Sequence, residues 1–249
     1  MKTSIQRASE RGQTQTPWLD SKHSFSFAGY RSRTQDNFGL LRTLNDDEIA
    51  PGKGFPSHAH SNMEIISIPL AGTLTHEDSE GNQGTITVGE VQIMSAGRGI
   101  THSEINTSTT EPCQFLQIWI EPQKSNLEPS YASKEFDDEY LHNHFATIAS
   151  PNRKHGSLLI HQEAWLCLGH FDQWYNLDYH LRGESRYNRD TRTVERHTGV
   201  YLFVISGSVE VEGETLAKRD SIAITDTSKF NLTALEPDTH ILLIEVPIK

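Results

Sequence analysis

Residues 52–66 read GKGFPSHAHSNMEII, a glycine-rich approach to two histidines that stand one residue apart. On a β-strand, side chains two residues apart point to the same face, so His58 and His60 would project together. In the later stretch THSE, His102 and Glu104 have the same spacing and would share one face of a second strand. Two such strands would offer three imidazoles and one carboxylate, a donor set that suits iron, nickel, copper, manganese or zinc.

A second carboxylate competes with Glu104 for the fourth position. Glu64 follows His60 by four residues, so an uninterrupted strand would place it on the same face as the histidines. Strand parity therefore leaves Glu64 and Glu104 as alternatives. A single histidine on a strand is usually a surface or core residue, and the prediction of a metal site depends on the two spaced pairs occurring together.

Short apolar runs bounded by turn residues dominate the chain and predict β-strands. Examples are residues 40–45, 63–70, 85–88 and 114–121. The order of strand, glycine turn, hairpin and second strand over residues 68–94 occurs again over residues 204–224. This repeat of architecture predicts two similar β-barrels. The acidic stretch between them, residues 123–144, is expected to be a solvent-exposed connection.

Composition and charge exclude several classes of protein. The chain has 249 residues and a net charge of −11, which disfavours nucleic-acid binding through a basic face. No apolar run approaches the roughly 20 residues that a membrane span needs. The N-terminal residues lack the apolar core of a secretory signal, so we expect a soluble cytoplasmic protein. Cys113 and Cys167 have neither metal-binding nor disulfide spacing and are expected to be buried free thiols.

Two stretches of the chain resemble the sequence motifs of cupin barrels. Residues 52–64, with Gly72 beyond them, are similar to the first motif, and residues 89–106 are similar to the second. The second motif has Ser95 where a proline is usual and two additional residues before His102. That departure resembles the pirin family.

Further segments carry the resemblance to pirins: residues 23–28, 41–47, 54–60, 78–82 and 91–104. Together they span about residues 18–122, and the half of the chain after residue 123 resembles the family only in layout. One difference is Ala59, since the family usually has a proline between the two histidines. This change removes no ligand.

The resemblance, together with the repeat, implies an all-β bicupin fold in which two jelly-roll β-barrels pack together. We expect residues 1–125 to form an N-terminal metal-binding cupin domain and residues 126–249 a C-terminal cupin-like domain without metal ligands. Around residues 200–225 the second half has no His-x-His or His-x-Glu pair, and its nearest histidines are His197 and His240.

The resemblance also implies a ligand set and a cofactor. One divalent transition metal, with iron as the expected metal, would be bound by His58, His60, His102 and Glu104. Glu64 would then lie outside the coordination sphere, where it would orient a ligand or a bound water molecule.

Bacterial pirins of this type resemble quercetin 2,3-dioxygenases, which open the heterocycle of a flavonol with O₂ and release carbon monoxide. The implied function is a metal-dependent dioxygenase, with a flavonol-like aromatic substrate and O₂, in which Glu104 or Glu64 accepts the hydroxyl proton. The alternative is a regulatory pirin that binds another protein and in which the dioxygenase activity is incidental. We expect a monomer, because the chain already pairs two barrels.

Overall fold

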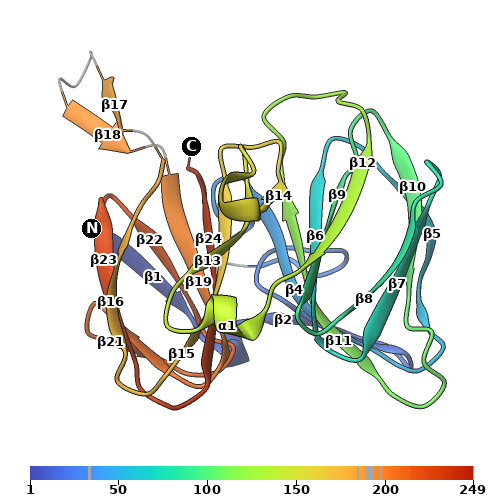
Figure 1. The fold of residues 1–249 in the computed structure, drawn as a ribbon, viewed down its shortest axis with the longest axis horizontal. Helices are drawn as coiled ribbons and strands as arrows, with labels where there is room; N and C mark the ends of the chain where they lie inside the picture. The colour runs from blue at the N-terminus through green and yellow to red at the C-terminus, as the bar shows by residue number, and fades with distance from the viewer. Residues whose placement is uncertain (33–34, 184, 189–192, 197, 249) are drawn as a thin grey trace.

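Two β-barrels stand side by side, one formed by the N-terminal half of the chain and the other mainly by the C-terminal half (Figure 1). The computed structural model describes residues 1–32, 35–183, 185–188, 193–196 and 198–248. Within these ranges the helical elements are short: η1 (Ala8–Glu10), α1 (Asp138–Leu141) and η2 (Lys154–Gly156). None of the helices that the structure describes has the length and the apolar sequence needed to cross a membrane. The predicted all-β fold with two barrels is confirmed.

The N-terminal barrel is built from a large and a small antiparallel sheet. The order of the large N-terminal sheet is β12 (Ser130–Glu135), β9 (Glu90–Ser95), β6 (Glu64–Ala71), β11 (Cys113–Ile120), β4 (Leu41–Ile49), β3 (Leu19–His23) and β2 (Gly12–Gln15). The order of the small N-terminal sheet is β5 (Gly54–His60), β10 (Ile100–Ile105), β7 (Thr73–Asp78) and β8 (Gln83–Thr87).

The C-terminal barrel repeats this arrangement, except that β13 and β14 at one edge of its large sheet pair in parallel. The order of its large sheet is β1 (Lys2–Gln6), β22 (Ser221–Thr225), β19 (Thr198–Ser206), β24 (Thr239–Pro247), β15 (Trp165–Phe171), β13 (Ala146–Ser150) and β14 (Leu158–Leu159). The order of its small sheet is β16 (Asn176–His180), β23 (Lys229–Ala234), β20 (Val209–Val211) and β21 (Glu214–Leu216). A separate hairpin consists of β17 (Ser185–Asn188) and β18 (Thr193–Arg196).

The first strand of the chain and the first strand after residue 125 each pair with a sheet of the other predicted domain. Strand β1 belongs to the large C-terminal sheet, where it pairs with β22, and β12 belongs to the large N-terminal sheet, where it pairs with β9. Residues 123–144, expected as an exposed connection, therefore contain an edge strand and α1. Most side chains of β12 are exposed, which explains its polar sequence. The division of the chain at residues 125 and 126 stays a prediction.

Apolar residues form one core between the barrels and separate cores inside them. The cluster between the barrels combines the outward-facing residues of both large sheets, such as Ile66 and Ile118 with Leu242 and Ile244. One continuous apolar cluster fills the C-terminal barrel. Inside the N-terminal barrel two small clusters are separated along β11, where Phe115 belongs to one, Trp119 packs against the other and a glutamine lies between them.

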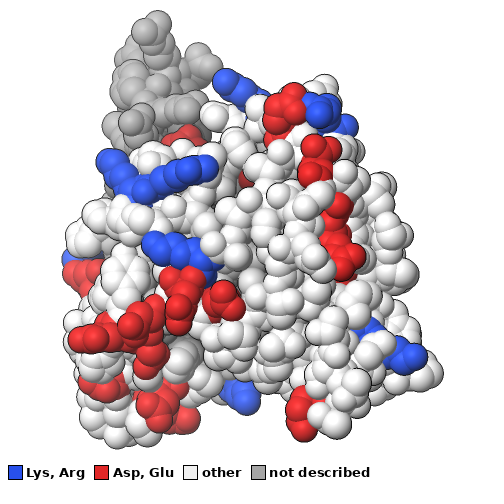
Figure 2. Space-filling model, turned by 45° about the vertical axis from the view of Figure 1, so that its right-hand side comes forward, with Lys and Arg blue, Asp and Glu red and all other residues white. Residues whose placement is uncertain are grey.

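Both cysteines are buried free thiols, as predicted. Burial raises the pKa of Cys113 to about 12 and that of Cys167 to about 11, so neither forms a reactive thiolate near neutral pH. On the surface, acidic side chains gather low on the C-terminal barrel, while Lys and Arg occur singly or in small groups on the face that Figure 2 shows.

Candidate metal centre

Strands β5 and β10 carry the predicted ligands and lie next to each other in the small N-terminal sheet. His102 stands directly opposite His58 in the antiparallel register. The two strands approach each other closely at Gly54, where a Cβ atom would come within 2.2 Å of the carbonyl oxygen of Glu104. A β-bulge between His102 and Glu104 then shifts the pairing. Glycine at this point thus permits the strand contact that places the histidines together.

The imidazoles of His58, His60 and His102 form one cluster. Their ring centroids lie 4.8 Å apart for His58 and His60, 4.5 Å for His58 and His102, and 5.1 Å for His60 and His102. Each ring offers a nitrogen within 4.8 Å of those of the other two. The structure therefore brings together three of the four predicted ligands.

The hydrogen bonds around these rings leave their Nε2 atoms available. Nδ1 of His58 lies 2.8 Å from the carbonyl oxygen of Pro56, so it donates there and leaves Nε2 unprotonated. Nε2 of His60 and Nε2 of His102 are buried and have no hydrogen-bond partner among the described residues. A buried polar atom without a partner costs about 1–3 kcal/mol, and a bound cation would remove that cost.

Burial keeps two of the imidazoles neutral. It lowers the pKa of His60 to about 4 and that of His102 to about 3, together with a smaller effect of the neighbouring His58. At neutral pH these rings carry free lone pairs, which is the form that binds a metal ion.

A row of polar side chains crosses the inner face of the large N-terminal sheet opposite this cluster. Neighbouring members of this polar row face each other in the strand register: His23 on β3, Asn45 on β4, Gln117 on β11, Ser67 on β6 and Gln92 on β9. On β6, β9 and β11 these inward polar residues alternate with outward residues that are largely apolar, whereas the outward positions of β3 and β4 include charged residues such as Lys22 and Glu48. The row separates the two small apolar clusters of this barrel.

Glu104 is held by the polar row. Gln117 donates to its Oε2 at 2.6 Å, and Ser67 donates to its Oε1 at 2.9 Å. Burial raises the pKa of Glu104, and these two hydrogen bonds act against the rise. The carboxylate belongs to a second group of possible ligands with His76 and His102, and it is not within the same distance of all three clustered histidines. Glu104 thus adjoins the cluster.

Glu64 lies on the opposite face of its strand. Ser95 donates to its Oε1 at 2.7 Å, and the backbone N–H of His161 donates to its Oε2 at 3.2 Å, which places the side chain between the barrels. The parity argument that put it beside His60 is wrong here, because residues 61–63 separate β5 from β6 and Asn62 is left-handed (φ 51°). The structure does not bring Glu64 into the cluster.

Two further residues support His102 and were not singled out from the sequence. Nδ1 of His102 lies 3.4 Å from Nδ1 of His76, whose Nε2 lies 3.0 Å from Oδ2 of Asp78. A histidine whose other ring nitrogen is held in this way keeps the tautomer and orientation that a metal needs. The signal in the sequence was present, because His76 and Asp78 stand two residues apart on one strand.

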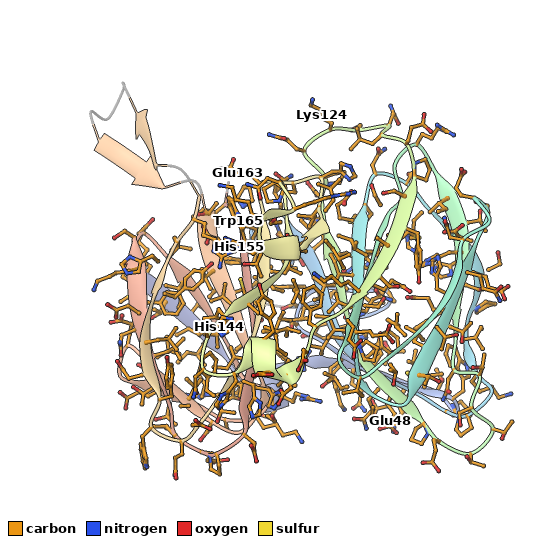
Figure 3. The ribbon with its side chains drawn as sticks, in the orientation of Figure 1. Glu48, Lys124, His144, His155, Glu163 and Trp165 are labelled. Atoms are coloured by element: carbon orange, nitrogen blue, oxygen red, sulfur yellow. The ribbon has the colours of Figure 1, made fainter. Side chains whose placement is uncertain are left out.

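The cluster opens into a cavity of about 250 Å³. The three imidazoles and Glu104 form part of its wall, and apolar side chains form another part: Leu19, Phe27, Phe55, Ile65 and Trp119. Trp119 lies close to the cluster, with its ring 4.9 Å from that of His60. The labelled His144, His155 and Trp165 of Figure 3 lie outside the N-terminal barrel.

Comparisons with known proteins agree with this geometry. Residues 4–120 match the pirin family, and residues 147–246 match the quercetinase C-terminal cupin domain. The sequence is 36% identical to quercetin 2,3-dioxygenase of Escherichia coli strain K12 over 98% of both chains. The chain belongs to the pirin family. It is also 39% identical to a pirin-like protein of Caulobacter vibrioides over 92% of both chains.

A solved pirin structure is similar over the whole chain. The bacterial pirin YhhW of E. coli in complex with nickel(II) has a TM-score of 0.89 and 33% identity, with 100% of both chains covered. In the present pirin, His58, His60 and His102 fit a divalent cation because each offers a ring nitrogen within 4.8 Å of those of the other two, and Nε2 of His60 and Nε2 of His102 are buried without a partner among the described residues. The participation of Glu104 stays a prediction.

The interior of this pirin's C-terminal barrel has a different character. A row of inward residues that stand opposite one another on adjacent strands crosses its large sheet, and this row is apolar: Ile5, Ile222, Leu202, Leu243 and Cys167. His197 lies outside the described residues. His240 stacks on His170 at 4.1 Å and, with Asp138, forms a partly exposed group of possible ligands away from the barrel interior.

Proposed function

We propose that this pirin is a metal-dependent dioxygenase that cleaves flavonols such as quercetin with O₂. The observation that carries the proposal is the cluster of three imidazoles in the wall of a cavity of about 250 Å³. The 36% identical relative named quercetin 2,3-dioxygenase supports the substrate class. The nickel(II) complex of a similar pirin supports a divalent transition metal.

The metal would be held by Nε2 of His58, His60 and His102, with Glu104 as the proposed fourth ligand. A bound transition metal supplies Lewis-acid polarisation of a hydroxyl oxygen and access to O₂. Iron is the metal we propose, and the same donor set suits nickel, copper, manganese or zinc.

Glu104 is the residue best placed to accept the hydroxyl proton of the substrate. Its carboxylate lines the cavity, and burial raises its pKa, so it holds a proton more readily than an exposed glutamate. Gln117 and Ser67 fix its position through their hydrogen bonds. Glu64, the other predicted base, lies between the barrels and would have no contact with a substrate in this cavity.

The apolar part of the cavity wall would hold the aromatic rings of the substrate. Phe27, Phe55 and Trp119 offer ring surfaces and exclude water from the reacting atoms.

For the protein as a whole, we also propose a cytoplasmic monomer. Size-exclusion chromatography of the purified chain can check the oligomeric state.

The proposal is tested by quercetin consumption under air with metal-loaded protein. Loss of the flavonol absorbance, O₂ uptake and carbon monoxide release would be followed for the wild type, for His58→Ala/His60→Ala and for Glu104→Gln. A matched control removes two exposed histidines elsewhere, His144→Ala/His155→Ala. Many turnovers in wild type and control, with none in the ligand variant, are expected.

Two other outcomes would contradict the proposal. Equal consumption in the wild type and in His58→Ala/His60→Ala would show that the cluster has no part in the reaction. Fewer than one turnover per protein molecule would favour the alternative, a metal-containing pirin that binds another protein and in which the dioxygenase activity is incidental.

A further inference from the structure

The cavity has a second polar surface, on strands β2, β3 and β4 of the large sheet. Ser21 stands directly opposite Asp47, and His23 stands directly opposite Asn45 in the strand register. All four side chains line the cavity, and each residue is at most 2% exposed. Buried polar groups usually have at least one hydrogen-bond partner, so unpaired polar atoms that face a cavity point to a ligand there.

Hydrogen bonds fix the orientation of His23 and Asn45. Nε2 of His23 lies 2.8 Å from Oγ1 of Thr14, and its Nδ1 lies 2.9 Å from Oδ1 of Asn45. Burial lowers the pKa of His23, so the ring is neutral. One tautomer satisfies both contacts: the Thr14 hydroxyl donates to Nε2, and Nδ1–H donates to Asn45. The amide nitrogen of Asn45 then has no partner among the described residues.

Asp47 has an unpaired oxygen beside this amide. The Ser21 hydroxyl donates to Oδ1 of Asp47, and Oδ2 has no hydrogen-bond partner within the described ranges. Burial raises the pKa of Asp47 to about 7, although the Ser21 hydrogen bond acts against the rise. Strand β4 therefore presents an unpaired amide donor and an unpaired carboxyl oxygen two residues apart, on the face that looks into the cavity.

We propose that Asn45 and Asp47 bind a hydroxyl group on the aromatic ligand, at the end of the ligand remote from the imidazoles. An aromatic hydroxyl has one hydrogen to donate and lone pairs to accept, so it can donate to Asp47 and accept from Asn45 at once. A site built in this way rejects an analogue that lacks the hydroxyl, because its polar groups then stay buried and unpaired. This specificity role rests on the proposed function, which supplies the aromatic ligand.

The cavity is small enough that one ligand would contact both the imidazoles and the polar residues of β4. Its volume of about 250 Å³ lies near the lower end of small-molecule pockets, which hold roughly 300–1,000 Å³. The same cavity is lined by His58, His60 and His102 on the small sheet and by Asn45 and Asp47 on the large sheet. A ligand that reaches the imidazoles with one oxygen would place its other end against β4.

The test compares two flavonols that differ only in the hydroxyls on their other rings. Quercetin and 3-hydroxyflavone both carry the hydroxyl next to the carbonyl, and 3-hydroxyflavone has none on its other rings. Their affinities for metal-loaded protein would be measured by fluorescence titration without O₂, so that no turnover is needed. The variants are Asp47→Leu, Asn45→Leu and the isosteric Asp47→Asn. The control is Glu48→Gln, the exposed neighbour on β4 that Figure 3 labels.

We expect the wild type and Glu48→Gln to bind quercetin at least about tenfold more tightly than 3-hydroxyflavone, as loss of the two hydrogen bonds to Asn45 and Asp47 predicts. Asp47→Leu and Asn45→Leu should reduce this ratio to near one by weakening quercetin binding alone, and Asp47→Asn should give an intermediate ratio.

The failures of the two proposals are distinguishable. A ratio that stays unchanged in all three variants, or a wild type that binds both flavonols equally, would overturn the specificity role while turnover could still support the dioxygenase. A wild type that binds neither flavonol would overturn both.

Discussion

The two barrels of this pirin have similar strand orders and differ in the row of residues that crosses the inner face of the large sheet. On the large N-terminal sheet the inward row is His23, Asn45, Gln117, Ser67 and Gln92, whereas the large C-terminal sheet has Ile5, Ile222, Leu202, Leu243 and Cys167 in its inward row. The apolar row forms part of one continuous core. The polar row divides its barrel into two small cores and leaves a cavity between the sheets.

The difference shows how one architecture supports two roles. Buried apolar side chains contribute stability in proportion to their area, roughly 25 cal/mol per Å². Buried polar side chains contribute little unless each is paired, but they can hold a carboxylate such as Glu104 in one position. The shared core between the large sheets lets the C-terminal barrel support the N-terminal one, whose own interior is occupied by the site.

Removal of two imidazoles from the N-terminal barrel should produce the largest effect. In His58→Ala/His60→Ala we expect metal content to fall from about one equivalent to nearly none and flavonol turnover to fall about 100-fold or more, because supporting residues alone are worth 10–100-fold. Elemental analysis and turnover measure this, with His144→Ala/His155→Ala as the control. Retention of the metal in the ligand variant would refute the assignment of the site to this barrel.

A polar residue placed in the apolar row tests the comparison directly. Leu243 is fully buried in the C-terminal core, so Leu243→Gln should lower the free energy of unfolding by about 4 kcal/mol, from lost apolar burial and an unpaired amide. The reciprocal change, Gln117→Leu, should cost less, about 1–3 kcal/mol, because it leaves Oε2 of the buried Glu104 without its hydrogen-bond donor. Denaturant unfolding of both variants measures this. Equal destabilisation by the two changes would remove the distinction between the interiors.

The polar interior should also make stability depend on pH. The folded-state pKa of Asp47 is raised from 3.8 to about 7, so between these values the folded protein holds a proton that the unfolded chain has lost. Stability is therefore lost as pH rises through this window, by roughly 4 kcal/mol in all, and is constant above it. Asp47→Asn cannot titrate, so it should become more stable relative to the wild type from about pH 4 to about pH 7. A pH-independent difference between the two proteins would contradict this.

The fold and the histidines were predictable because their signals are local. Turn residues bound each strand, and His58 with His60 form a pair whose direction follows from strand geometry alone. The face of Glu64 was not predictable, because a single left-handed residue, Asn62, interrupts the strand before it. A count of residues cannot show such an interruption.

Long-range pairing accounts for the other features that the sequence did not reveal. Ser67, Gln92 and Gln117 are isolated polar residues in three apolar strands, and only the register of those strands joins them into one row. The exchange of β1 and β12 between the barrels is likewise decided by pairing at sheet edges, far from either segment in sequence.

The smallest predicted effect concerns the residues that support His102 in the N-terminal barrel. Asp78 accepts a hydrogen bond from Nε2 of His76. Burial raises the pKa of Asp78, but hydrogen bonds with His76 and Asn82 outweigh this effect and hold the pKa below the usual range. The ionised carboxylate keeps His76 in the tautomer that accepts from Nδ1–H of His102, and this leaves Nε2 of His102 for the metal. We expect Asp78→Asn to weaken metal binding by about tenfold, measured by competition with a chelator. Glu77→Gln, the exposed neighbour on the other face of β7, should leave the affinity unchanged, and a loss of equal size in both variants would show that the effect is one of surface charge.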